Sequence, residues 1–152
     1  MTTPIVRPAA ATDAVELARL FTVLEHPTSA ADVTARWAQW AAEGNDALVA
    51  DRGDGTLAGL ATLHRTRVLH RPAPVGRITA LVVDAAERGR GIGRALVAAA
   101  EERLTRDGCI LLEITSNLRR ADAHAFYERI GYARTSLRLA RTLPIIPSGG
   151  RA

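Results

Sequence analysis

The sequence predicts an α/β domain with one mixed sheet, whose elements run strand, two helices, three strands, helix, strand, helix, and a final strand or hairpin. Two observations support this prediction. Segments with apolar residues at helical spacing alternate with short β-like runs along the chain. No repeat and no linker-like stretch interrupts that order, and 152 residues is an ordinary length for one domain. We therefore expect a single domain over residues 1–152, with a frayed tail at residues 147–152.

Capping residues and periodicity predict the first two helices. Asp13 and Glu16 have the spacing of a capping box at the start of the first helix. Ser29, which follows Pro27, is placed to cap a second helix that ends at Gly44. The apolar face of the first helix comprises Leu17, Leu20, Phe21 and Leu24. The apolar face of the second comprises Val33, Trp37, Trp40 and Ala41.

Short apolar runs between turn signals predict the strands, and glycines close two later helices. The expected strands cover residues 4–7, 47–50, 57–63, 77–83 and 110–115. The Asp-Gly pair at residues 54–55 marks a hairpin turn. A helix is expected from Gly91 to Arg106, and a last helix closes at Gly131. The apolar face of that last helix carries Ala123, Phe126, Tyr127 and Ile130. Alternating residues over 133–143 predict a final strand or hairpin.

Composition limits the cellular setting and the partners. The single cysteine, Cys109, cannot form an intrachain disulfide, which favours a reducing compartment. We see no signal-peptide pattern, and no apolar run approaches the roughly 18 residues that span a bilayer. We therefore expect a cytoplasmic protein with no membrane partner.

The charge of the chain favours an anionic partner. The formal net charge is +4, and all 20 basic residues are arginine. Aromatic residues make up only 4% of the chain, which leaves few surfaces for stacking nucleic-acid bases. The arginines are also spread along the whole sequence. A polyphosphate cofactor fits this charge as well as a nucleic acid does.

A glycine-rich turn between a strand and a helix is the most informative segment. Residues 84–94 follow an expected strand and lead into an expected helix, so backbone N–H groups gather at the positive end of a helix dipole. The glycines that allow close approach of an anion are Gly89, Gly91 and Gly93. The positive charges around them are Arg88, Arg90 and Arg94. A Walker loop is excluded because the chain has no lysine, and a dinucleotide fingerprint needs glycine where Arg94 stands.

Two motifs identify a family. The pattern Arg-x-x-Gly-x-Gly over residues 88–93 closely resembles the pyrophosphate loop of the GNAT acetyltransferases. Residues 123–132, Ala-His-Ala-Phe-Tyr-Glu-Arg-Ile-Gly-Tyr, resemble the second signature of that family. The order of elements matches the family's fold over nearly the whole chain. The resemblance implies the GNAT fold, a central twisted mixed sheet with about four helices. It also implies an N-acetyltransferase that passes the acetyl group of acetyl-CoA to a primary amine.

The resemblance also implies roles for individual residues. The backbone of the strand before the loop would pair with the pantetheine arm of acetyl-CoA, here at Leu81, Val82 and Val83. The loop amides would hold the pyrophosphate, here at Arg88, Gly89, Arg90, Gly91, Ile92, Gly93 and Arg94. Tyr127 occupies the position of the tyrosine that protonates the departing thiolate, and Asn117 lies near the position of a pantetheine contact. The parallel strands at residues 77–83 and 110–115 are expected to splay into a wedge. Family members are often dimers, which makes a homodimer possible here.

The general base stays open at this point. Many family members carry an acidic residue on the strand that precedes the loop, and residues 77–83 contain none. Glu113 lies in an apolar strand, where it is either a satisfied structural carboxylate or a proton acceptor. Glu25 and His26 lie between the first two helices, where they are either solvated polar groups or part of the acceptor side. We expect a water relay to one of these three groups.

Two alternatives from other classes remain. One is a GNAT-fold protein that binds acyl-CoA as a sensor without catalysis. The other is an arginine-rich nucleic-acid-binding module, with a steep salt dependence of binding. No metal is expected, because the histidines and Cys109 lack metal-ligand spacing. The acceptor amine, on a small molecule or a peptide, is not indicated by the sequence.

Overall fold

The computed structural model describes residues 2–116 and 121–147. The chain forms two compact units, residues 1–117 and 118–152, and each is described by itself. The first unit holds a five-stranded sheet in the order β1-β2-β3-β4-β5. Its strands are β1 (Ile5–Pro8), β2 (Asn45–Asp51), β3 (Leu57–Thr66), β4 (Val75–Val83) and β5 (Leu111–Ile114). Its helices are α1 (Ala14–Val23), α2 (Ala30–Ala42) and α3 (Ile92–Arg106).

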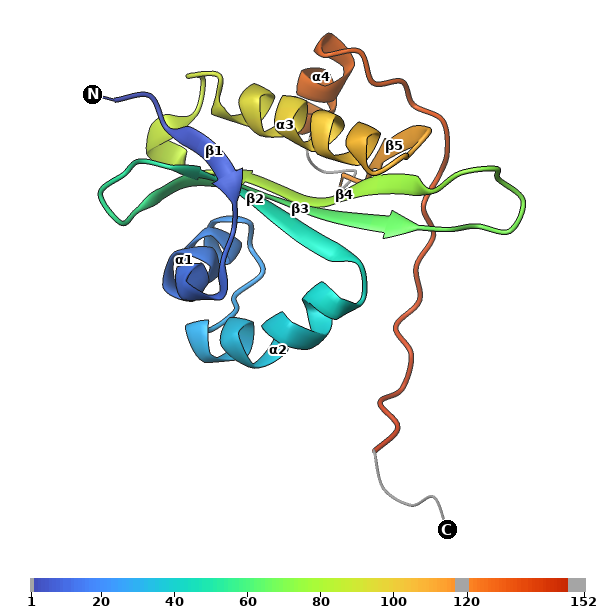
Figure 1. Cartoon of the computed structure of the whole chain (residues 1–152), viewed down its shortest axis with the longest axis horizontal. Coiled ribbons are helices and arrows are strands. Elements are labelled where there is room, and N and C mark those ends of the chain that lie inside the picture. The colour runs from blue at the N-terminus through green and yellow to red at the C-terminus, as the bar shows by residue number, and fades with distance from the viewer. Residues whose placement is uncertain (1, 117–120, 148–152) are drawn as a thin grey trace. The chain divides into compact units, whose positions relative to one another are not determined.

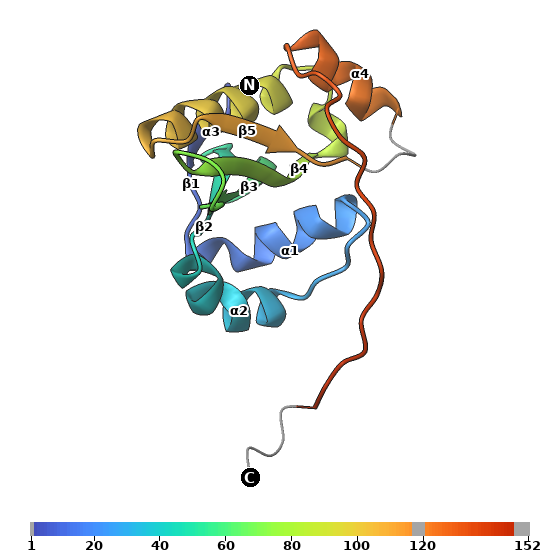
Figure 2. The same cartoon turned by 90° about the vertical axis from the view of Figure 1, so that its right-hand side faces the viewer.

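Helices α1 and α2 cover one face of the sheet and α3 covers the other, as Figures 1 and 2 show from two sides. The predicted mixed sheet is confirmed.

The pairing within the sheet is antiparallel from β1 to β4 and parallel between β4 and β5. The parallel ladder is short, since it joins Val75–Ile78 of β4 to Leu111–Ile114 of β5. Beyond Ile78, strand β4 continues to Val83 along β3. Within the described residues, the second half of β4 therefore has a strand partner on one edge only.

A β-bulge interrupts β4 at the point where that parallel ladder ends. Thr62 of β3 pairs with Ala80, whereas the next residue, Leu63, pairs with Ile78. Thr79 is thus an extra residue in β4. A bulge of this kind bends its strand, increases the local twist and re-aims side chains.

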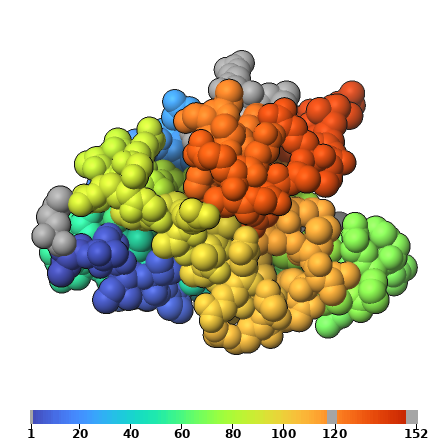
Figure 3. All heavy atoms as spheres, turned by 90° about the horizontal axis from the view of Figure 1, so that it is seen from above, coloured from blue at the N-terminus to red at the C-terminus, as the bar shows by residue number. Residues whose placement is uncertain are grey.

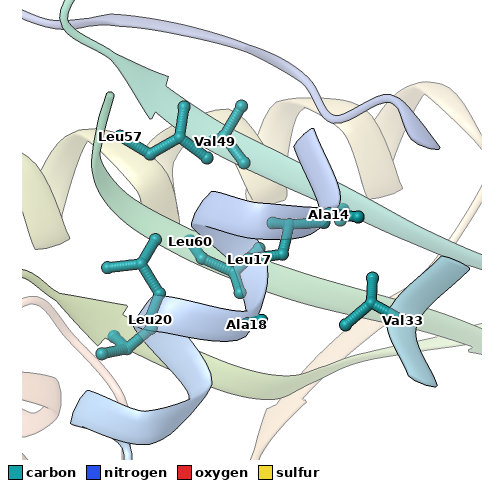
Figure 4. Close-up of a cluster of buried hydrophobic side chains, with 10 residues drawn as sticks. Ala14, Leu17, Ala18, Leu20, Val33, Val49, Leu57 and Leu60 are labelled. Atoms are coloured by element: carbon teal, nitrogen blue, oxygen red, sulfur yellow. The ribbon is translucent and has the colours of Figure 1, made fainter. Parts of the chain in front are cut away.

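An apolar core on the α1–α2 face holds both helices against the sheet. Figure 4 shows the side chains of α1 pointing toward those of β2 and β3. The buried members of this cluster are Ala14, Leu17, Ala18, Leu20, Val33, Ala47, Val49, Leu57, Leu60 and Val82. On the opposite face α3 lies close to the strands, because a Cβ atom added to Gly76 would come within 2.7 Å of Leu104. Burying a side chain such as Leu20 completely is worth about 1.5–3 kcal/mol.

The predicted caps of the first two helices have different outcomes. The Ser29 hydroxyl accepts a hydrogen bond from the Asp32 N–H at 3.0 Å, so the predicted cap of α2 is confirmed. The predicted capping box of α1 is wrong. The Asp13 carboxylate accepts from the Ala10 N–H at 2.8 Å, and Glu16 accepts from the Leu57 N–H at 2.9 Å. Glu16 therefore ties α1 to β3. The expectation that Ala41 lies on the apolar face of α2 is also wrong, because Ala41 is exposed.

The second unit contains α4 (Ala121–Arg129), which ends with Gly131 at a φ angle of 100° as predicted. Tyr127 lies on this helix, and its ring contacts those of Phe126 and Tyr132 with centroids 5.3 and 6.2 Å apart. The strand or hairpin predicted over residues 133–143 is wrong. Residues 133–147 form neither helix nor strand and are exposed. Alternation alone does not make a strand, which needs a paired neighbour to satisfy its N–H and C=O groups.

Two further expectations bear on the chain as a whole. A single domain over residues 1–152 stays a prediction, and the tail expected from residue 147 lies outside the described residues after Pro147. Of the helices in the described part of the chain, none combines the length and the apolar character needed to cross a membrane.

Candidate active site

The turn between β4 and α3 is open toward solvent. Gly89 and Gly91 have φ angles of 77° and 82°, in the left-handed region that favours glycine. A Cβ atom on either would meet none of the described heavy atoms within 4 Å, so both glycines border open space. Gly91 is the N-cap of α3, and among the described residues no side chain caps that end and no acid lies in its first turn. Its N–H groups and the positive end of the helix dipole therefore form a site suited to a phosphate.

The other residues of the loop are also consistent with a phosphate site. Arg88, Arg90 and Arg94 are exposed, so the turn carries three positive charges at the surface. Arg90 also pairs with Glu87 at 2.9 Å. The Ile92 side chain is buried, and because Ile92 is the first residue of α3 its N–H points toward the N-terminal end of the helix. Figure 3 shows the turn, in yellow-green, at the surface beside the first part of α3.

Ion pairs from distant parts of the chain anchor this turn. Arg52 binds Asp84 at 3.0 Å and Glu87 at 3.2 Å, and Arg19 of α1 binds Asp84 at 3.1 Å. Burial alone would raise the pKa of Asp84, but the hydrogen bonds and charges of Arg52 and Arg19 outweigh burial and lower that pKa. The acids of the turn are thus neutralised by anchoring partners. The sequence contains no local signal for this, since Arg19 and Arg52 are 65 and 32 residues from Asp84.

The strand that enters the turn presents one unpaired edge. Val82 is 4% exposed and packs into the α1–α2 core, while Leu81 and Val83 are half-buried. The β3 side of these residues is paired, and the other side has no strand partner within the described residues. Backbone groups along that edge can pair with an extended ligand, as a strand would.

A cavity of about 380 Å³ lies between the sheet and the helices α1 and α2. Its apolar lining comprises Leu17, Phe21, Leu24, Val33, Trp37, Trp40, Ala47, Leu60 and Ala80. Its polar lining comprises His26, Thr28, Arg36, Thr62 and Thr79. The hydroxyls of Thr62 and Thr79 lie 2.7 Å apart and share a hydrogen bond. Because Thr79 is the extra residue of the bulge, the cavity adjoins β4 where the strand bends. Sequence analysis placed His26 on a possible acceptor side but did not predict a cavity lined by these residues.

The three candidate bases, His26, Glu25 and Glu113, lie in different surroundings. His26 lines the cavity, whereas Glu25 and Glu113 are not part of its lining. Glu113 lies opposite Arg77 in the parallel ladder and pairs with it at 2.9 Å. Glu25 follows α1 with a φ angle of 68° and is exposed. Of the remaining candidates, Tyr127 lies on α4 in the second unit, and Asn117 lies outside the described residues. In the described part of the chain no three residues of His, Cys, Asp or Glu are grouped to hold a metal ion.

A mixed sheet with an open, uncapped glycine turn suits an α/β protein that binds a phosphorylated ligand. Residues 12–132 match the family described as Acetyltransferase (GNAT) family, and the chain belongs to this family. Its members use acetyl-CoA as a cosubstrate. The resemblance drawn from the two sequence motifs is confirmed at the level of the family and the fold.

Comparisons with known proteins give relatives with different acceptors. The chain is 39% identical over 90 residues to an aminoalkylphosphonate N-acetyltransferase of Salmonella typhimurium, covering 59% of this chain and 58% of that protein. It is 32% identical over 111 residues to glucosamine 6-phosphate N-acetyltransferase 1 of Oryza sativa subsp. japonica, covering 69% and 64%. The chain thus spans about three-fifths of the length of these relatives.

A solved structure supports the fold. The crystal structure of an acetyltransferase of Trypanosoma brucei superposes with a TM-score of 0.81 at 23% identity, covering 91% of this chain and 99% of that one. At that identity the likeness concerns the fold.

Proposed function

We propose that this chain is an N-acetyltransferase that transfers the acetyl group of acetyl-CoA to a primary amine by direct attack in a ternary complex. The open turn at the start of α3 is the observation that carries the proposal. It combines left-handed Gly89 and Gly91, an uncapped helix end and exposed arginines at the end of a half-paired strand. These are the features that a pyrophosphate followed by an extended pantetheine arm requires.

In this proposal the loop and strand hold the cosubstrate and the sheet orients it. The amides from Arg88 to Arg94 bind the pyrophosphate, and the free edge of Leu81–Val83 pairs with the pantetheine arm. Asn117 is a further candidate contact for that arm. Much of the rate gain comes from holding amine and thioester together. A backbone N–H near Val82 stabilises the carbonyl oxygen as negative charge develops on it.

Group transfer then requires two proton movements. The neutral amine nitrogen attacks the thioester carbon, the new C–N bond forms, and the C–S bond breaks to release CoA as a thiolate. The amine proton leaves through water toward His26, Glu25 or Glu113, of which His26 lines the cavity beside β4. Tyr127 donates a proton to the thiolate, because a tyrosine hydroxyl is protonated at neutral pH.

The acceptor is a small-molecule or peptide amine. The two curated relatives are named for an aminoalkylphosphonate and for glucosamine 6-phosphate, both small phosphorus-containing amines. From these relatives we carry over to this chain only the type of reaction, which is acetylation of an amine nitrogen. The lone, half-buried Cys109 and the absence of a spanning helix among the described residues support a cytoplasmic location.

A thiol-release assay tests this function. Purified protein with acetyl-CoA and a panel of primary amines is expected to release CoA thiol with at least one amine, and mass spectrometry should find the acetylated product. Binding of acetyl-CoA without thiol release on any amine would contradict catalysis and favour a sensor. Salt-sensitive DNA binding without any effect of acetyl-CoA would favour the nucleic-acid module.

A further inference from the structure

The cavity under α1 and α2 is small and mostly apolar. At about 380 Å³ it lies near the lower end of the roughly 300–1,000 Å³ usual for ligand sites. Its described lining residues lie between Leu17 and Ala80, within the first unit. Nine apolar residues form its walls, eight from α1, α2 and strands β2 to β4 and one, Leu24, directly after α1. These walls favour an occupant with a largely apolar body.

Half of the aromatic residues of the chain line this cavity. The chain has two residues each of tryptophan, phenylalanine and tyrosine, and both tryptophans and Phe21 line the cavity. The rings of Trp37 and Trp40 lie 5.3 Å apart and are tilted by 45°. Both are only half-buried and pack against the core from α2. Such surfaces favour a flat ring, since offset and edge contacts between aromatic groups add about 0.5–1.5 kcal/mol to area burial.

The charges around the cavity exclude several acceptor classes. Among the described residues, its lining contains Arg36 and His26 but no aspartate or glutamate. The Arg36 side chain is 69% exposed and its nearest acidic partner, Asp32, is 4.0 Å away, so Arg36 lies at the rim. An ammonium group that enters without a counter-charge loses its hydration and gains no ion pair. Acceptors with several ammonium groups, such as polyamines and aminoglycosides, are disfavoured. A monoamine can enter in its neutral form, which is also the form that attacks.

The polar lining includes a pair of hydroxyl groups that suits an amino group. The Thr62 residue is 8% exposed, and its hydroxyl is hydrogen-bonded to that of Thr79 at the bulge of β4. A hydroxyl can both donate and accept, so this pair can bind a neutral amino group. Ala80, on the same strand, adds a small side chain that leaves room beside it.

We propose that the acceptor is an amine with one amino group on an aromatic or similarly flat apolar body, seated with its ring against Trp37 and Trp40 and its nitrogen toward Thr62 and Thr79. This inference rests on the proposed function and narrows the acceptor class. It departs from the anionic, non-aromatic amines for which the two curated relatives are named.

Intrinsic fluorescence can test this without catalysis, because both tryptophans of the chain line the cavity. The protein is titrated with 2-phenylethylamine, spermidine and 2-aminoethylphosphonate in the absence of acetyl-CoA. We expect 2-phenylethylamine to change tryptophan emission saturably, at a concentration at least tenfold lower than either of the others. Equal or weaker binding of 2-phenylethylamine would overturn the inference.

Two variants and a matched control localise the binding. Ala80→Leu fills the cavity and is expected to weaken 2-phenylethylamine binding at least tenfold. Ala98→Leu makes the same change on the exposed side of α3 and should leave binding unaltered. Trp37→Ala serves as the second cavity variant, and it should weaken 2-phenylethylamine binding while leaving that of 2-aminoethylphosphonate within a factor of three. Unchanged binding by both cavity variants would overturn the assignment.

Thiol release separates the two proposals. If 2-phenylethylamine binds in the cavity but no amine is acetylated, the acetyltransferase function fails and the cavity assignment stands. If spermidine or 2-aminoethylphosphonate is acetylated with a higher kcat/KM than 2-phenylethylamine, the acceptor class is wrong and the acetyltransferase function stands.

Discussion

Two glycines with the same backbone conformation offer a matched test of the proposed pyrophosphate site. Gly91 has a φ angle of 82° and Gly53, in the turn after β2, has a φ angle of 81°. A Cβ atom on either would meet no described heavy atom within 4 Å. Changing each to glutamate therefore imposes the same cost, roughly 1–2 kcal/mol for a side chain in the left-handed region. In a chain of 152 residues this lowers Tm by about 2–8 °C.

The two variants should differ in their response to acetyl-CoA. At a hundredfold excess over Kd, a ligand that binds only the folded state stabilises it by about 2.7 kcal/mol, which raises Tm by about 5–11 °C. Gly53→Glu should keep this gain, because its turn lies outside the proposed site. Gly91→Glu places a carboxylate at the start of α3, where it competes with the pyrophosphate, and should lose the gain. A carboxylate at a helix N-terminus is itself stabilising by about 0.3–1 kcal/mol, so the variant should remain folded.

Thermal unfolding followed by circular dichroism, with and without acetyl-CoA, measures both effects in one experiment. Loss of the ligand-induced rise in Gly91→Glu alone supports the loop assignment. An equal rise in both variants would refute it, and so would a wild-type protein whose Tm does not respond to saturating acetyl-CoA.

Three further predictions concern catalysis and stability. Tyr127→Phe should lower kcat by roughly a hundredfold or more with little change in Tm, as steady-state kinetics would show, because it removes a general acid but keeps the ring. His26→Gln should flatten the acid limb of the kcat/KM pH profile while Glu113→Gln leaves it intact; the reverse pattern would move the relay to the sheet edge. Asp84→Asn should lower the free energy of unfolding by about 1–3 kcal/mol at pH 7. The pKa of Asp84 is lower in the folded protein than in the unfolded chain, where it is near 4. The stabilisation that the Asp84 carboxylate gives to the folded state is therefore fully present above pH 4, and it is lost as the pH falls through the pKa of the folded protein. Urea unfolding of wild type and variant should therefore converge in acid.

Local sequence signals predicted the elements of this fold well. Ser29 caps α2 because a hydroxyl reaches the N–H three residues later, a contact that depends on nearby residues alone. The glycines at 44, 108 and 131 follow helices for the same local reason, and each has a positive φ angle. The predictions that failed depend on distant partners. Glu16 has the spacing of a capping residue, but the N–H of Leu57, 41 residues away, competes for its carboxylate.

In the candidate site, too, the features that depend on neighbouring residues were predictable and those that depend on distant residues were not. The glycine turn is recognisable because its chemistry is local: a strand end, three glycines and a helix start. The arginines that anchor the turn, Arg19 and Arg52, come from other elements and are not distinguishable in the sequence from the other arginines. The cavity is equally invisible, because it joins side chains from two helices and three strands that only the folded sheet brings together.

The bulge at Thr79 explains why the faces of β4 could not be assigned from its sequence. In a regular strand, residues an even number apart lie on the same face. Gly76 and Val82 are six apart, yet Gly76 faces Leu104 of α3 and Val82 packs with the α1–α2 core. One extra residue between them, Thr79, reverses the alternation of side chains between the two faces of β4. The pairing shows this extra residue, because the adjacent β3 residues Leu63 and Thr62 pair with Ile78 and Ala80. A bulge also bends its strand, and this one directly follows the last pair of the parallel ladder with β5, at Ile78. Ala80, next to this inserted position, lines the cavity, and beyond it β4 has a strand partner on one edge only within the described residues, so the proposed acceptor and cosubstrate sites share one stretch of strand.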